Sequence, residues 1–189
     1  WLFNARLTYD TPDSVTSRIG LFDEDFMQFG PFDHHDYKLI GKKEILIPYN
    51  NNKAAAAKPE DLVGKNFLNP DQVRWELHRV WEIEANVAAG KRHVVAKRKY
   101  YVDEDSWQII LFDGWDAQGQ LWRTHFTLTV LAPEVPALYG NVYWGGYNLQ
   151  TGGYYLNAAS NGLSKQVGPA PQLTEKFFTP EELANLGAR

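Results

Sequence analysis

The chain has 189 residues, of which 44% are hydrophobic and 22% are charged, values typical of one folded domain and unlike disordered or fibrous proteins. Its formal net charge of -4 disfavours nucleic-acid binding, and its lack of cysteine excludes disulfides, thiolate zinc sites and thiol catalysis. Its 7 Trp, 10 Tyr and 10 Phe supply flat apolar surface that suits either a sheet core or a ligand groove.

The first third of the chain gives one clear secondary-structure signal. Residues 1–31 mix short apolar runs with Asp, Ser and Gly, and they predict at most one strand, over residues 2–9. Residues 37–49 form a β-rich run that predicts a strand, with Gly41 as a bulge and Pro48 near its end.

The middle of the chain gives the strongest signal, because four long β-patterned runs are separated by compact turn sequences. Turns at Gly90, 103–106 and 116–119 divide them, and the last suits a type I turn with Gly119 in the left-handed conformation. Such short turns leave no room for crossover connections, so consecutive strands should pair antiparallel as a meander. The four runs are residues 75–87, 92–102, 107–115 and 120–131.

Two further aromatic runs, residues 139–149 and 154–158, predict another hairpin. Helices are short and few: one turn over residues 53–58 and a terminal helix that opens at the sequence TPEE, beginning with Thr179, and ends near Gly187. The fold class is therefore mainly β, an antiparallel meander with few short helices.

The turn positions also predict which side chains share a face of the sheet. They set a register in which two rows of side chains lie side by side on one face, while Glu82 lies opposite Lys97 on the other. The first row is Trp81, Arg98, Leu111 and His125, and the second is Ile83, Ala96, Asp113 and Arg123.

This face supports a ligand-binding hypothesis. Cations set in an apolar concavity can orient an amphipathic ligand whose tail covers the aromatic surface, with Arg98 and Arg123 meeting the polar head. The alternative is that Asp113 and Arg123 form a stabilising cross-strand pair, and both interpretations can hold together. The candidate ligand-binding residues are Trp81, Arg98, Tyr100, Ile109, Leu111, Asp113, Trp115, Arg123 and His125.

Other candidate chemistry is weaker. Glu82 and Glu84 have a spacing that glycosidases use, but they share a face with lysines, which favours paired, solvated carboxylates. The run His34 to Asp36 does not suit a metal because adjacent residues on an extended chain point apart, and the acidic turn 103–105 lacks a calcium-loop pattern. Nucleophile, phosphate-loop and dinucleotide motifs do not occur. We therefore predict no enzyme activity, no metal and no cofactor.

A resemblance to a known family is carried by the stretch LNPDQVRWELHRVWEIEANVAAGKRHVVAKRKYYVDEDSWQIILFDGWDAQGQLWR. It resembles the Gram-negative envelope family catalogued as domain of unknown function thirteen-twenty-nine, often labelled outer-membrane lipoprotein-sorting protein. DYKLIGKKEILIPYNN, YNLQTGGYYL and FTPEELANLG resemble its flanking pieces. The family is similar to the LolA and LolB lipoprotein carriers, whose unclosed β-barrel holds acyl chains beneath helices. Fewer helices are visible here than a full lid requires.

The resemblance implies a single β domain over residues 1–189, as the C-terminal part of a longer precursor, with an unclosed half-barrel. It implies a carrier or binding module for a lipid, an acyl chain or another hydrophobic ligand, in the periplasm or at the inner face of the outer membrane. Its expected partner is an envelope transporter. Two alternatives stay open: an aromatic platform that binds carbohydrate, which solvent exposure of Trp115, Trp144 and Tyr147 would favour, and a structural assembly subunit without a small ligand.

Overall fold

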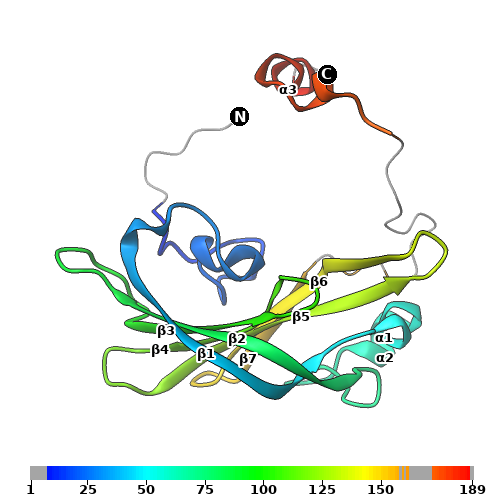
Figure 1. The fold of residues 1–189 in the computed structure, drawn as a ribbon. Helices are drawn as coiled ribbons and strands as arrows, with labels where there is room; N and C mark the ends of the chain where they lie inside the picture. Colours follow the sequence, from blue (N-terminus) through cyan, green and yellow to red (C-terminus); the bar gives the residue numbers. More distant parts are fainter. Residues whose placement is uncertain (1–7, 158, 160, 162–171, 188–189) are drawn as a thin grey trace.

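The main feature of the computed structural model is one antiparallel sheet of seven strands that pair in sequence order (Figure 1). The structure describes residues 8–157, 159, 161 and 172–187. Strands β1 and β7 are the two edges, so the sheet is not closed into a barrel and the mainly β meander is confirmed. The strands are β1 (His35–Pro48), β2 (Trp75–Val87), β3 (Lys97–Asp103), β4 (Ile109–Trp115), β5 (Leu121–Ala132), β6 (Ala137–Asn148) and β7 (Gly153–Asn157).

The helices are short, as expected, and side chains cap two of them. The Asn161 side-chain nitrogen donates to the carbonyls of Ala54 (2.7 Å) and Ala57 (2.8 Å) at the end of α1. The Glu182 N–H donates to the Thr179 hydroxyl at 3.3 Å at the start of α3. None of the described helices is long and apolar enough to cross a membrane. They are η1 (Phe22–Met27), η2 (Phe32–His34), α1 (Asn52–Ala56), α2 (Pro59–Leu62), η3 (Glu175–Phe178) and α3 (Pro180–Gly187).

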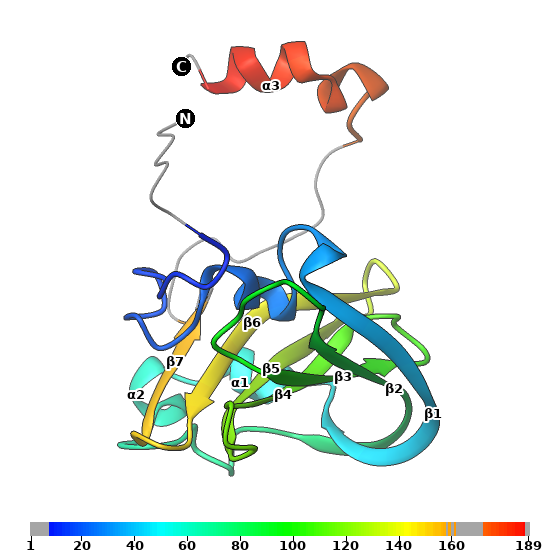
Figure 2. The same ribbon diagram turned by 90° about the vertical axis from the view of Figure 1, so that its left-hand side faces the viewer.

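Different segments cover the two faces of the sheet (Figures 1 and 2). The N-terminal segment, described residues 8–34, packs through Met27 and Ile19 on one face, which we call the N-terminal face. Helices α1 and α2 pack on the opposite face, which we call the helix face. The N-terminal face contributes Ala85, Tyr100, Phe112, Trp144 and Tyr155 to one core cluster, and the helix face contributes Phe126, Leu128 and Tyr143 to another.

The predicted register is wrong, although the strand order is right. Arg98 lies opposite Ala85 and Gly114, and Phe112, not Leu111, lies opposite His125. The expected pairs of Glu82 with Lys97 and of Asp113 with Arg123 do not form: Glu82 lies opposite Tyr101 and Asp113 opposite Thr124. Leu111 and Asp113 therefore lie on the helix face, because a shift of one residue moves a side chain to the other face.

Loops and bulges explain the register error. Residues 88–96 form a long connection between β2 and β3 rather than a tight turn at Gly90, so β3 begins at Lys97 and not at residue 92. An extra residue in β4, Ile110, bulges opposite the step from Tyr101 to Val102. The predicted bulge at Gly41 is confirmed, with φ of 146°. The strand expected over residues 2–9 falls mostly outside the described residues, and Thr8 and Tyr9 are not in a strand.

We expect Gly146→Ala to destabilise the protein by about 1–3 kcal/mol, the range for overpacking a core. A Cβ at Gly146 would lie 2.5 Å from the buried His125 ring, which packs under β6. Urea unfolding measures the change. The matched control is Gly153→Ala, whose Cβ would meet ordinary contacts of 3.4 Å and should change stability little. Equal stability of the two variants would contradict the close packing of His125 against Gly146.

Candidate functional site

Two buried arginines dominate the N-terminal face. Arg98 is fully buried, and its Nη2 lies 2.8 Å from Asp23 Oδ2 of η1. His93 Nε2 lies 3.0 Å from the same oxygen. Because the Val95 N–H donates to His93 Nδ1 at 2.9 Å, His93 carries its proton on Nε2 and donates to Asp23. Burial acts to raise the pKa of Asp23, but His93 and Arg98 outweigh it and hold that pKa below its usual value.

The second arginine has its own carboxylate. Arg123 Nη1 lies 3.1 Å from Glu24 Oε2 and also donates to the backbone carbonyl of Ile19. The same Glu24 oxygen accepts the Leu21 N–H at 2.8 Å and lies 3.6 Å from His125 Nε2. Burial lowers the pKa of His125 to about 4 against the opposing charge of Glu24, so its ring is neutral at pH 7.

This cluster is closed rather than open to a ligand head. Arg98, Arg123 and His125 are at most 4% exposed, and the carboxylates that neutralise them come from the N-terminal segment. The sequence correctly grouped these three residues on one face, but the expectation that they face an open concavity is wrong. Asp23 and Glu24 were missed because residues 1–31 gave no regular pattern. The available signal was the acidic run DED, set between apolar residues, and buried arginines that need carboxylate partners.

The nine candidate residues divide between the two faces of the sheet. Leu111, Asp113 and Trp115 lie on the helix face, where the Tyr101 hydroxyl donates to Asp113 at 3.1 Å and Lys97 lies over the Trp115 ring. Asp113 therefore lies on the other face of the sheet from Arg98, Arg123 and His125, with which it was grouped. The others stay on the N-terminal face: Trp81, Arg98, Tyr100, Ile109, Arg123 and His125.

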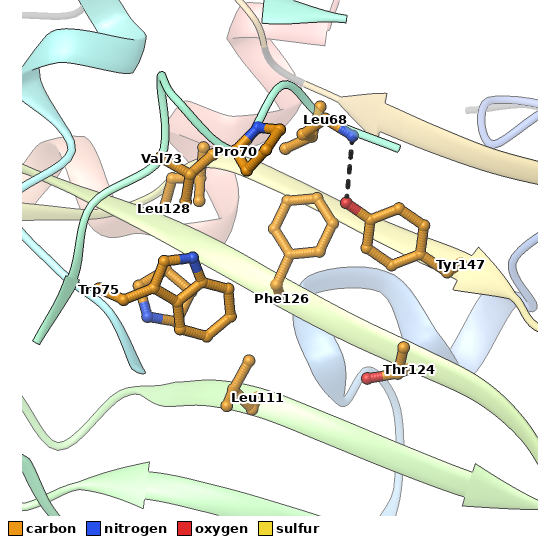
Figure 3. A pocket seen from close by; sticks show the side chains of 10 residues that line it. Leu68, Pro70, Val73, Trp75, Leu111, Thr124, Phe126, Leu128 and Tyr147 are labelled. Atoms are coloured by element: carbon orange, nitrogen blue, oxygen red, sulfur yellow. Dashed lines mark hydrogen bonds between the residues drawn. The ribbon is translucent and has the colours of Figure 1, made fainter. Parts of the chain in front are cut away.

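An apolar pocket of about 220 Å³ lies on the helix face, beneath the connection from α2 to β2 (Figure 3). Figure 3 shows Leu68, Pro70 and Val73 of that connection lying over Phe126 of β5. Trp75 is 49% exposed and lies at the pocket's rim. Of the nine predicted residues, Leu111 alone lines the pocket. The full lining is Pro48, Leu68, Pro70, Val73, Trp75, Leu111, Thr124, Phe126, Leu128 and Tyr147.

Specific hydrogen bonds tie the segment that covers the pocket, residues 50–74, to the sheet. The Asn52 side chain donates to the Leu131 carbonyl at 2.7 Å and accepts the Leu131 N–H at 3.0 Å. The Leu68 N–H donates to the Tyr147 hydroxyl at 3.4 Å, the bond drawn in Figure 3. Sequence reasoning missed this site because the apolar residues of its roof, spaced irregularly through LNPDQV, carry no helical or strand period.

The two glutamates of β2 on the helix face are paired with lysines. Glu82 pairs with Lys43 at 2.7 Å and also with Lys99, and Glu84 pairs with Lys97 at 2.9 Å. The interpretation of these glutamates as paired carboxylates is confirmed, although Lys97 pairs with Glu84 and not with Glu82.

A small cluster of possible metal ligands sits at the turn after β3. Donor atoms of His78, Asp103 and Asp105 all lie within 4.8 Å of one another. Asp103 Oδ1 lies 3.0 Å from His78 Nδ1, and Asp103 Oδ2 accepts the N–H and hydroxyl of Ser106 at 2.8 and 2.6 Å. These hydrogen bonds account for the cluster as the anchor of the turn.

Sequence comparison identifies the family. A family described as protein of unknown function (DUF1329) matches residues 4–184. The chain belongs to this family. It is 34% identical, over 205 aligned residues, to the uncharacterized protein PA3922 of Pseudomonas aeruginosa. That alignment covers all of this chain but 44% of the relative, so the chain spans less than half the length of the curated protein it matches.

Two solved structures are similar to this DUF1329 chain. One is a DUF1329 family protein from Desulfovibrio piger, with 13% identity, a TM-score of 0.47 and coverage of 94% of this chain and 58% of that one. The other is described as an outer membrane lipoprotein-sorting protein domain from Vibrio parahaemolyticus, with 11% identity, a TM-score of 0.43 and coverage of 87% and 53%.

We expect Asp23→Ala to destabilise the protein by about 3–5 kcal/mol, because it leaves Arg98 buried without its carboxylate. Chemical denaturation measures this loss. The control is Asp33→Ala, which removes a surface pair with Lys91 and should change stability little. Similar losses in the two variants would contradict the buried-pair interpretation.

A second prediction concerns pH. Burial, reinforced by the charges of Asp13, Glu24 and Asp23, raises the pKa of Asp25 to about 6. A carboxyl whose folded pKa lies above its unfolded value destabilises the fold when it ionises, so this cost grows as pH rises from 3.8 and is complete above pH 6. Asp25→Asn should therefore be more stable than the parent at pH 8, by roughly 1 kcal/mol after discounting for solvent exposure.

The difference should almost vanish at pH 3, below the ordinary pKa of 3.8, where Asp25 is protonated in both the folded and the unfolded state. Urea unfolding at both pH values tests this sign. Asp33→Asn serves as the control: Lys91 lowers the pKa of Asp33, so the amide should bring no gain at pH 8. A stability gain for Asp25→Asn that is the same at both pH values would contradict the titration argument.

Proposed function

We propose that this DUF1329 chain is a binding module that holds the apolar part of a hydrophobic ligand, such as a lipid or an acyl chain, in the pocket beneath residues 68–75. The observation that carries the proposal is the pocket itself, whose lining is almost entirely apolar. Its polar side-chain atoms are the hydroxyls of Thr124 and Tyr147 and the indole nitrogen of Trp75. The proposed role is carriage or storage, without catalysis.

The size of the pocket limits what it can hold. An apolar cavity of about 150 Å³ stays dry and binds benzene, so a cavity of about 220 Å³ suits one small apolar group or the end of one chain. Each buried methylene contributes about 0.8 kcal/mol. Burial of about four methylenes therefore supplies about 3 kcal/mol, less than the roughly 8 kcal/mol of micromolar affinity, so contacts of the rest of the ligand must add to it.

The carbohydrate alternative has less support. A sugar platform needs exposed aromatic rings, but Trp144 is 5% exposed and packs between Phe26 and Tyr155. Tyr147 is half-buried and lies against Phe126 in the pocket wall. The assembly-subunit alternative requires a packed face without a cavity, and the pocket argues against it for the helix face.

The proposed location is the periplasm or the inner face of the outer membrane, as the family resemblance implies. An envelope transporter is the proposed partner, because a carrier of apolar molecules needs a donor or an acceptor for its cargo. Support for both rests on family membership, which residues 4–184 establish.

The test uses the uncharged fluorescent probe N-phenyl-1-naphthylamine, whose emission rises in an apolar site. Leu111→Arg should abolish probe binding because it places a charge in the pocket, and Leu111→Trp should weaken binding because the indole fills it. Bound probe should also raise the melting temperature of the parent by mass action.

The matched control is Leu39→Arg, the same change at an exposed position of β1 that does not line the pocket. It should bind the probe as the parent does. Urea unfolding checks that each variant folds. Probe binding that survives both Leu111 variants, or that Leu39→Arg also removes, would refute the proposed site.

A further inference from the structure

The apolar pocket adjoins two polar pockets, one at each end of its roof. Val73 lines both the apolar pocket and a polar pocket of about 390 Å³ formed by the start of α1 and residues 71–74. Leu68 and Pro70 line both the apolar pocket and another polar pocket beside α2. A ligand whose tail fills the apolar pocket can thus place its head at either end of residues 68–75.

The two ends differ in charge. The first polar pocket contains Lys53 and Arg74 against one acidic residue, Asp71. The second contains Glu60 and Asp61 against one basic residue, Lys65. The Val73 end therefore favours an anionic head, and the Leu68 end favours a cationic one.

Hydrogen bonding at the Val73 end also favours an anion. Lys53 Nζ donates to the backbone carbonyl of Asp71 at 2.6 Å, and no described carboxylate forms an ion pair with it. Arg74 pairs with Glu76 through Nε at 2.9 Å, while no described residue accepts a hydrogen bond from its terminal nitrogens. Asn51 is fully buried, its Oδ1 accepts the Arg74 N–H at 2.8 Å, and its amide nitrogen has no acceptor among the described residues.

We propose that the ligand is a single-chain amphiphile with an anionic head, a carboxylate or a phosphate, whose head lies against Lys53 and Arg74 and whose tail crosses Val73 into the apolar pocket. This inference rests on the proposed function. One tail is specified because 220 Å³ lies below the roughly 300–1,000 Å³ of pockets that enclose drug-sized ligands. An anionic head is specified because Lys53 and Arg74, at that end of the roof, both keep N–H donors that no described residue accepts.

The experiment measures displacement of N-phenyl-1-naphthylamine by three amphiphiles of equal chain length: dodecanoate, dodecyl phosphate and dodecyltrimethylammonium, each below its micelle concentration. The parent should bind the two anions at least about tenfold more tightly than the cation, because charge-assisted hydrogen bonds are the stronger ones. Whichever of dodecanoate and dodecyl phosphate binds more tightly identifies the preferred head as a carboxylate or a phosphate.

The variant Lys53→Gln with Arg74→Gln should lose about tenfold in affinity for the anions and should keep its affinity for the uncharged probe. The control, Lys58→Gln with Arg79→Gln, removes the same charges from residues that do not line either pocket. Arg79 matches Arg74 closely, since it is similarly exposed and pairs with Glu104 through Nε. This control should retain the preference for anions.

The outcomes separate the two proposals. Probe binding with equal or stronger affinity for the cation, or an anion preference that survives loss of Lys53 and Arg74 charge, overturns the head assignment and leaves the proposed function intact. Failure of the uncharged probe to bind the parent overturns the proposed function and this inference with it.

Discussion

Arg98 and Arg123 bury two positive charges on one face of the sheet. This constraint determines how the N-terminal segment packs. Moving a guanidinium out of water costs several kcal/mol unless a carboxylate accompanies it. Strands β3 and β5 supply the arginines, but the carboxylates come from η1, far away in sequence. Residues 8–34 must therefore lie on the sheet in one position, with Asp23 over Arg98 and Glu24 over Arg123.

That requirement determines which face can hold a ligand. The N-terminal segment is joined to the sheet by its side chains, through the two ion pairs and through Gln28, which accepts the Tyr100 hydroxyl at 2.7 Å. It covers the aromatic surface that would otherwise be available to an apolar molecule. Asp23 and Glu24 occupy the positions that a ligand's anionic head would take on this face. A ligand that does not displace them must bind on the helix face.

The strands could be predicted from the sequence because they depend on local pattern and turn chemistry. Gly119, expected to be left-handed, has φ of 75°, and β2 spans the residues expected. Register depends on loop length and bulges, which a pattern of alternating residues does not reveal. One bulge at Ile110 and one long loop before Lys97 were enough to move Leu111 and Asp113 to the other face. The charged partners were missed because ion pairing between distant segments leaves no local signal.

The position of the pocket follows from the apolar residues that the helix face carries over β4 to β6. Over β2 and β3 the face carries Glu82 and its lysines, which water can solvate without a cover. Over β4 to β6 the helix face carries Leu111, Phe126 and Tyr147, apolar side chains that a covering segment must shield from water. Residues 50–74 provide that cover, and the pocket is the space between the sheet and Leu68, Pro70 and Val73 of this segment.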